Sequence, residues 1–268
     1  MAISTRSFEA ITEAFHRASG IRLGDAKRQL VVGRLQKLAR DRGMDNLDQY
    51  VQSVVQGGDS DELVRVVDKL TTNETYFFRE PAHFDFLGDL LDKGALGSPG
   101  KGIDLRVWSA ASSSGEEAYS IAMLLADKVG RSGWQVVGTD LSTAMVRACE
   151  RALYPLDRTQ HMPPNYLKQF CLRGEGNYAG HLLIKRELRA RTRFVAANLM
   201  QPLPDIGEFD VIFLRNVLIY VDPESKQDIV QRVLQRLRPG GYLLTGHAES
   251  INGQQLGLRM LRPAIYQR

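Results

Sequence analysis

The chain has 268 residues, of which 43% are hydrophobic and 25% are charged, a composition typical of a globular protein with a sizeable core. It contains no apolar run near the about 20 residues that cross a bilayer, and no apolar signal segment at its N-terminus. Its two cysteines, Cys149 and Cys171, lack the spacing of metal ligands. These features exclude a disulfide-rich or zinc-stabilised secreted protein and predict a cytoplasmic protein of one or two domains.

The positive charge is concentrated in one segment. Residues 20–44 hold seven basic residues against two acidic ones, whereas residues 45–80 hold eight acidic residues against three basic ones. The net charge of +4 identifies no partner by itself. A concentrated basic segment, however, can steer an acidic partner toward the N-terminal part of the chain.

The first 70 residues predict helices at 7–20, 24–43, 46–58 and 60–70, with Asp25 near the start of the second and Ser60 as N-cap of the fourth. On the second helix, Val31, Leu35 and Leu38 share one side. Four basic residues occupy a separate arc of about 140°: Lys27, Arg34, Lys37 and Arg40. Such an arc is usually a solvated face, but it also suits the docking of an acidic partner.

The rest of the chain predicts an α/β domain. A helix at 81–94, opened by Pro81, precedes a Gly/Pro-rich stretch at 94–102. Apolar runs at 103–111, 134–140, 209–216 and 242–247 then alternate with helical segments at 116–130, 142–153 and 225–241. This rhythm is typical of a parallel sheet covered by helices. Residues 155–193 interrupt it, and 169–188 predict an inserted hairpin with a Gly/Asn turn.

In a doubly wound sheet, ligands bind beyond the carboxyl ends of the strands. After the first strand comes "SAASSSGEEAYS", where small residues allow a ligand to approach the backbone and Gly115 can adopt conformations closed to other residues. The alternative is an ordinary serine-rich turn. The second strand ends in Asp140, which can accept hydrogen bonds from both hydroxyls of a ribose or can cap the following helix.

Two later strand ends complete a nucleoside site. Asn198 and Leu199 offer an amide and an apolar side chain for adenine, and Arg215, Asn216 and Tyr220 follow the next strand. His247, after the last strand, more commonly has a capping or packing role than a catalytic one.

The type of nucleoside cofactor is indicated by the loop after the first strand. It lacks the G-x-G-x-x-G pattern, and Glu116 and Glu117 would repel a pyrophosphate. Carboxylates suit S-adenosylmethionine, which carries a sulfonium and an ammonium group but no phosphate. The sequence therefore favours a methyltransferase over a dehydrogenase, with no metal.

Two alternative functions remain at this point. A sequence pI of about 9.1 and the basic segment suit a nucleic-acid methyltransferase. Against it, the basic segment has few aromatic residues for stacking bases, and "MPPNY" at 162–166, which is similar to a DNA-methylating signature, lies in the inserted segment. The other alternative is a non-catalytic regulator that senses S-adenosylmethionine or S-adenosylhomocysteine.

Five motifs in fixed order resemble those of the chemotaxis receptor methyltransferases of the CheR type: "TTNETYFFRE" (71–80), "VWSAASSSGEEAYSIAMLL" (107–125), "GTDLS" (138–142), "ANL" (197–199) and "FLRNVLIYVD" (213–222). The resemblance covers nearly the whole chain. It implies a helical N-terminal domain at 1–70 for receptor docking and a linker at 71–90 that contributes to the active site. Residues 91–268 would form a Rossmann-like S-adenosylmethionine-dependent methyltransferase domain, with a small antiparallel β insertion at about 160–192.

The resemblance also implies an activity, in which a methyl group passes from S-adenosylmethionine to glutamate carboxylates of membrane chemoreceptors. The products would be γ-glutamyl methyl esters and S-adenosylhomocysteine. The implied partners are the cytoplasmic methylation helices of the receptors, a receptor C-terminal peptide at the β insertion, and a regulatory adaptor. We expect a monomer that is recruited to membrane receptor arrays and does not bind nucleic acid.

Residue by residue, the resemblance assigns roles to the motifs. Arg79 and Tyr220 match positions beside the reacting methyl group. Of the two adjacent glutamates, we favour Glu117 over Glu116. The implied cofactor contacts are Asn73, Thr75, Arg79, Glu117, Asp140, Asn198, Leu199, Arg215 and Asn216. The basic arc of four residues would dock the receptor.

Overall fold

The computed structural model describes residues 2–96 and 105–268. The N-terminal part consists of α1 (Thr5–Ser19), α2 (Arg28–Asp41), α3 (Leu47–Gln56) and α4 (Ser60–Leu70), with a 3₁₀ turn at Asp25–Lys27 before α2. Their buried faces form one core around Phe15, Leu35 and Tyr50. Asp59, rather than the expected Ser60, caps α4, because its carboxylate accepts the backbone N–H of Glu62.

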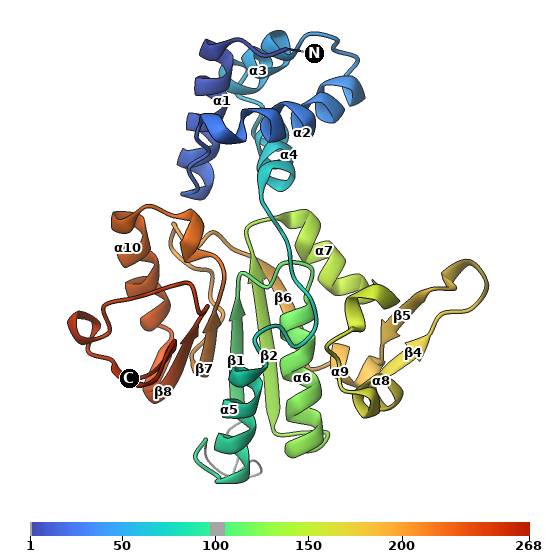
Figure 1. The fold of residues 1–268 in the computed structure, drawn as a ribbon, viewed down its shortest axis with the longest axis vertical. Coiled ribbons are helices and arrows are strands. Elements are labelled where there is room, and N and C mark those ends of the chain that lie inside the picture. Colours follow the sequence, from blue (N-terminus) through green and yellow to red (C-terminus); the bar gives the residue numbers. More distant parts are fainter. Residues whose placement is uncertain (1, 97–104) are drawn as a thin grey trace.

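A seven-stranded sheet forms the centre of the second domain (Figure 1). Its parallel part runs in the order β6 (Thr192–Ala196), β2 (Trp134–Asp140), β1 (Leu105–Ala110), β7 (Phe209–Leu214) and β8 (Leu237–Thr245). Two antiparallel strands, β10 (Ile265–Gln267) and β9 (Arg259–Arg262), complete one edge. The chain order reverses between β1 and β7, which is where ligands bind in such sheets.

Helices cover both faces of the sheet. Val107, Val211 and Leu244 pack on one face, with α5 (Pro81–Asp92) and α6 (Glu116–Lys128). The next or preceding residue in each strand points to the other face. These residues are Trp108, Ile212 and Leu243, and they pack there with α10 (Pro223–Leu234). This alternation explains the continuous apolar runs in the sequence, because a strand buried on both faces has no polar side.

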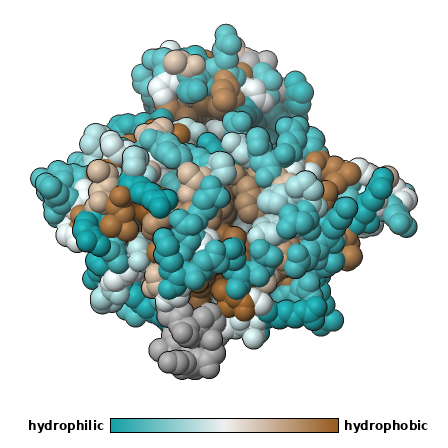
Figure 2. Space-filling model, turned by 60° about the horizontal axis from the view of Figure 1, so that its bottom comes forward, coloured by the Kyte–Doolittle hydropathy of each residue, from teal (hydrophilic) through white to brown (hydrophobic). Residues whose placement is uncertain are grey.

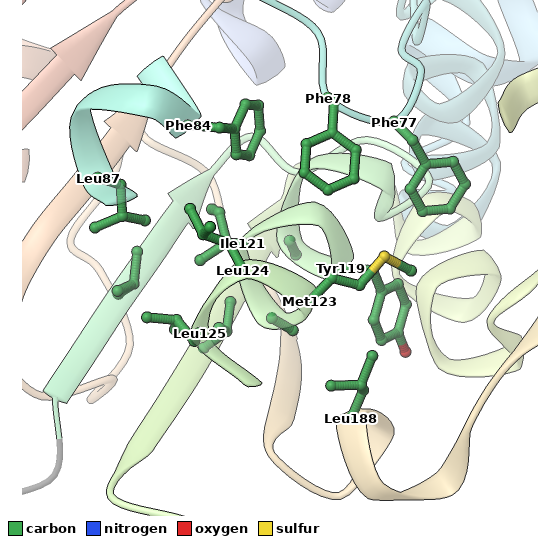
Figure 3. Close-up of a cluster of buried hydrophobic side chains, with 14 of the residues drawn as sticks. Phe77, Phe78, Phe84, Leu87, Tyr119, Ile121, Met123, Leu124, Leu125 and Leu188 are labelled. Atoms are coloured by element: carbon green, nitrogen blue, oxygen red, sulfur yellow. The ribbon is translucent and has the colours of Figure 1, made fainter. Parts of the chain in front are cut away.

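The aromatic residues of "TTNETYFFRE" anchor the connection between the two domains. Phe77 and Phe78 are buried against α6 in the core that also contains Phe84 of α5 (Figure 3). The backbone N–H of Phe78 donates to the hydroxyl of Ser120 on α6 at 3.0 Å. Burial of these two rings fixes residues 71–80 to the sheet domain, which makes this segment part of a rigid wall.

The small antiparallel sheet is confirmed, but it begins earlier than residue 160. Its order is β3 (Leu153–Pro155), β5 (His181–Ile184), β4 (Cys171–Arg173), so its first strand directly follows α7 (Thr143–Arg151). Two short helices, α8 (Pro164–Phe170) and α9 (Arg186–Arg189), flank it. The "MPPNY" motif starts α8, where Tyr166 is buried and donates to Asp127, and this is a structural role.

One expectation about the C-terminal part was wrong, and two strands were missed. The helix expected at 225–241 ends at Leu234, and β8 begins at Leu237, because Leu237 pairs with Phe209 of β7. Strands β9 and β10 were not anticipated, since β9 is exposed along its whole length and carries no alternating pattern. Most of the Gly/Pro-rich stretch at 94–102 lies outside the described residues.

The surface mixes polar and apolar residues. On the face turned forward in Figure 2, hydrophobic residues are interspersed with hydrophilic ones. Among the described residues, none of the helices has both the length and the apolar character needed to cross a membrane.

Two glycine substitutions test the packing. A Cβ on Gly138 of β2 would lie 2.5 Å from the ring of Phe194, whereas a Cβ on Gly33, inside α2, would meet open space. We expect Gly138→Ala to lower the free energy of unfolding by about 1–3 kcal/mol through overpacking. Gly33→Ala should raise it by about 0.5–1 kcal/mol, because alanine loses less backbone entropy in a helix. Chemical denaturation followed by circular dichroism measures both. A fully stable Gly138→Ala variant would contradict the described packing.

Candidate active site

A cleft that is open to solvent lies between the helical domain and the carboxyl ends of the parallel strands. All the residues predicted to contact a cofactor line it: Asn73, Thr75, Arg79, Glu117, Asp140, Asn198, Leu199, Arg215 and Asn216. Tyr220 and Lys27 line it as well. The structure therefore gathers residues from five separate motifs and from both domains around one space.

The loop after β1 forms one wall of the cleft. Its Ser113 donates its backbone N–H to Asp140 at 2.7 Å and its hydroxyl to the carbonyl of Asn73 at 3.0 Å. Gly115 has φ 100°, and a Cβ there would lie 2.8 Å from the hydroxyl of Tyr154. A side chain at this position would clash with Tyr154 and strain the backbone, which explains the glycine before α6.

Asp140 does not cap the helix that follows β2. The N-cap of α7 is Ser142, whose hydroxyl accepts the backbone N–H of Met145. The Asp140 carboxylate is buried and accepts the N–H groups of Ser113 and Ser142 instead. Burial raises the pKa of Asp140 to about 6, although both hydrogen bonds favour the charged form.

A buried ion network lies beside this wall. Arg215, at the end of β7, holds Glu117 of α6 at 2.9 Å and Glu80 at 3.1 Å. Burial raises the pKa of Glu117 despite the opposing effect of Arg215. At Glu80, burial also acts to raise the pKa, but Arg215 and Asn216 outweigh it and the pKa is lowered. Two carboxylates against one guanidinium leave an excess of negative charge, which favours a cationic ligand.

The structure distinguishes the two adjacent glutamates. Glu117 faces the cleft, and its other oxygen accepts the hydroxyl of Ser109 at 2.7 Å. Glu116 points elsewhere and pairs with Arg158 at 3.1 Å and the hydroxyl of Ser114 at 2.6 Å. Glu117, and not Glu116, therefore lines the cleft, and its contact with a cofactor stays a prediction.

Arg79 and Tyr220 both line the cleft. Arg79 comes from the segment between the two domains, and Tyr220 comes from the loop after β7. Arg79 donates to the carbonyl of Glu74 at 2.9 Å and lies over the ring of Tyr76. No carboxylate pairs with Arg79 anywhere in 2–96 or 105–268, so its charge is not compensated there. Tyr220 ends a 3₁₀ turn at Leu218–Tyr220 and is 41% exposed.

Sequence reasoning missed Glu249, which holds the loop that carries Tyr220. This carboxylate is buried and accepts four backbone N–H groups at 2.6–3.3 Å, from Asn216, Leu218, Ile219 and Gly246. One of these, Asn216, has φ 58°. No sequence pattern marks an isolated glutamate after the last parallel strand as the acceptor for a distant loop.

The helical domain closes one side of the cleft. The amide of Asn198 donates to the carbonyl of Ala18 at 2.6 Å, while its oxygen accepts the N–H of Met200. Ile21 also forms an isolated bridge with Val221, next to Tyr220. The Asn198 amide, expected to contact adenine, is therefore bonded within the protein and joins the two domains.

The basic arc divides into two parts. Arg34 is half-buried and donates to the carbonyls of Leu70 and Thr71 at 2.7 and 3.0 Å, which ties α2 to the end of α4. Lys27, Lys37 and Arg40 are exposed, and the described part of the chain offers them no ion pair. Arg34 thus has a structural role that the helical pattern did not reveal.

Fold and cleft together define a two-domain protein with a nucleoside-binding α/β domain capped by helices. Residues 73–265 match the family model "CheR methyltransferase, SAM binding domain", and residues 6–71 match "CheR methyltransferase, all-alpha domain". The chain belongs to the CheR methyltransferase family, and its α/β domain is that of an S-adenosylmethionine-dependent methyltransferase.

The chain is also similar to named proteins over nearly its full length. The chain is 34% identical over 269 residues to a chemotaxis protein methyltransferase of Escherichia coli, covering 99% of this chain and 92% of the relative. It is 37% identical over 262 residues to chemotaxis protein methyltransferase 2 of Pseudomonas aeruginosa, covering 97% and 91%. A chemotaxis protein methyltransferase of Salmonella typhimurium is 34% identical over 255 residues, covering 94% and 86%.

The raised pKa of Asp140 predicts how cofactor binding depends on pH. Below pH 6 the side chain is protonated and loses acceptor capacity for ribose hydroxyls; above pH 6 it is a carboxylate. We expect the affinity for S-adenosylhomocysteine to fall as the pH drops from 7 to 5, by up to about tenfold per unit below the pKa. Calorimetric titration across this range measures it. Asp140→Asn should bind weakly with a flat profile, and an unchanged pH dependence in that variant would contradict the assignment.

Proposed function

We propose that this protein transfers methyl groups from S-adenosylmethionine to glutamate carboxylates on the cytoplasmic helices of membrane chemoreceptors. The products are γ-glutamyl methyl esters and S-adenosylhomocysteine. The observation that carries the proposal is the uncompensated guanidinium of Arg79 in the same cleft as the acidic residues that suit the cofactor. The chemotaxis names of the relatives support the same class of substrate.

The residues of the cleft fit S-adenosylmethionine. When bound, this cofactor supplies an electrophilic methyl group on a sulfonium. The negative excess of Glu80 and Glu117 over Arg215 favours its positive charges, and Asp140 accepts bonds from its ribose. Four further residues line the space for the cofactor: Asn73, Thr75, Leu199 and Asn216. None of these contacts needs a metal ion.

The acceptor carboxylate needs placement rather than deprotonation. A glutamate is already ionised at neutral pH, so orientation supplies the catalytic advantage, which can amount to several kcal/mol. Arg79 positions this carboxylate through paired hydrogen bonds, with the Tyr220 hydroxyl as a second donor. Too tight an ion pair would stabilise the ground state and slow transfer. Arg79 also donates to the carbonyl of Glu74, so its guanidinium is shared between two acceptors, which limits that effect.

Docking uses the exposed part of the basic arc. Lys27 lines the cleft, and Lys37 and Arg40 lie further along the same helical segment. They provide a cationic track for helices rich in glutamate. Arg34 holds α2, which carries this track, against the end of α4. The outer edge of β4, which pairs only with β5 in the described chain, suits a receptor C-terminal peptide that adds a strand. These contacts recruit the protein, as a monomer, to membrane receptor arrays, where a regulatory adaptor acts on it.

The role of Arg79 is tested by its removal. Arg79→Ala should lower turnover on receptor by about 100-fold or more, because the acceptor carboxylate loses its orientation. Arg79→Lys should retain part of the activity, since it keeps the charge without the planar fork. Receptor methylation kinetics and S-adenosylhomocysteine titration measure the effects, with exposed Arg17→Ala as the control. Wild-type turnover and cofactor affinity in Arg79→Ala would contradict the role.

Docking is tested by charge reversal at the two exposed positions beyond the cleft. The double variant Lys37→Glu and Arg40→Glu should raise the apparent KM for receptor at least tenfold and leave S-adenosylhomocysteine affinity within about twofold, because electrostatic steering acts on the partner alone. Arg131→Glu, exposed at the opposite end of the sheet, is the matched control. Arg34 is avoided, since its reversal would damage the fold. Equal losses in receptor and cofactor affinity would refute docking at this track.

A further inference from the structure

Three side chains gather behind the wall of the cleft: Glu80, His83 and, from a distant part of the chain, His247. Glu80 precedes α5, His83 lies in its first turn, and His247 follows β8. One oxygen of Glu80, Oε2, lies 3.4 Å from Nδ1 of His83 and 3.0 Å from Nδ1 of His247. The two imidazole rings stack with their planes 7° apart, and the ligand atoms all lie within 4.8 Å of one another.

His83 is the unexplained member of this cluster. It is fully buried, and neither of its ring nitrogens has a hydrogen-bond partner among the described residues. Buried polar atoms without a partner are rare because each costs about 1–3 kcal/mol. Imidazole nitrogens are common metal ligands, so a bound cation would give His83 the partner that it lacks.

We propose that Glu80, His83 and His247 form a binding site for a divalent transition-metal cation of the Zn²⁺ class. Zinc bonds to nitrogen and carboxylate oxygen are about 2.0–2.2 Å long, so tetrahedral ligand atoms lie about 3.3 Å apart. The two distances from Glu80 lie near that value. Because the two rings are stacked, the half-exposed His247 ring turns out of the stack so that nitrogens of both imidazoles face one ion. His247 is half-exposed, which gives an ion a path inward and leaves a coordination position for water.

Arg215 is the group that opposes a cation here, because it lies 3.1 Å from the same oxygen of Glu80. Its other nitrogen is bound by Glu117 at 2.9 Å, so Arg215 keeps a partner when Glu80 turns toward the metal. The buried carboxylate of Glu249 lies on the neighbouring loop and bonds the N–H of Gly246, next to His247. The local excess of carboxylates therefore offsets the charge of a bound ion.

The site is linked to the cleft through shared residues. Glu80 contacts Arg215 and Asn216, both of which line the cleft. A metal that draws Glu80 away alters this wall, so metal and cofactor weaken each other's binding. This regulatory step rests on the proposed function, whereas metal binding itself does not.

Cobalt titration tests the site directly. The full chain, treated with a chelator, is titrated with Co²⁺ while visible absorption reports a low-symmetry nitrogen and oxygen site. We expect one equivalent to bind, to be displaced by Zn²⁺, and to bind at least tenfold more weakly in His247→Ala. His181→Ala, on the small sheet, is the matched control and should bind as the wild type does. No stoichiometric binding, or equal affinity in His247→Ala, would overturn the proposal.

A second measurement separates the regulation from the proposed function. The dissociation constant of S-adenosylhomocysteine is measured with and without saturating Zn²⁺. It should rise at least tenfold with the metal in the wild type and remain unchanged in His247→Ala. An unchanged constant in the wild type would overturn the coupling. If Co²⁺ binds but S-adenosylhomocysteine does not bind under any condition, the proposed function fails while the metal site stands.

Discussion

The guanidinium of Arg215, held between Glu80 and Glu117, is the contact on which the cleft depends. It joins the end of β7, the start of α6 and the segment that connects the two domains. Burying three charges is costly, and removing one partner of a buried pair typically costs about 3–5 kcal/mol. One negative charge of the two carboxylates remains unpaired, and a cationic cofactor would neutralise it. The network therefore suits ligand binding as well as stability.

The segment 71–80 is held in place by both domains. Arg34 of the helical domain donates to the carbonyl of Thr71, the first residue of the segment. Three side chains of the sheet domain donate to carbonyls further along the segment: Ser113, Arg158 and Arg215. Phe78 and Glu80 adopt left-handed conformations, with φ 57° and 58°. Non-glycine residues persist there only where their surroundings fix them. The strain therefore indicates a preorganised wall, which places Arg79 without any need for a loop to close.

Much of this was readable from the sequence. Strands buried on both faces gave long apolar runs, and small or polar residues at their ends marked the cleft. The network around Arg215 was only partly visible. Glu117 and Arg215 were expected at the cleft, but Glu80 appears as a surface-type residue until the fold brings it to Arg215. Glu249 and the His83–His247 stack left no local pattern. Arg34 looked like a member of an exposed arc, since a helical wheel cannot show that the end of α4 lies against it.

The central claim is that glutamate side chains of chemoreceptors accept the methyl group, and one measurement tests it most directly. The purified protein is incubated with methyl-labelled S-adenosylmethionine and membranes that contain chemoreceptors. Matched membranes carry receptors whose methylated glutamates are replaced by alanine. The account predicts base-labile label, released as methanol, on the intact receptor and none on the alanine variant. Label on nucleic acid, or no transfer to receptor, would contradict it.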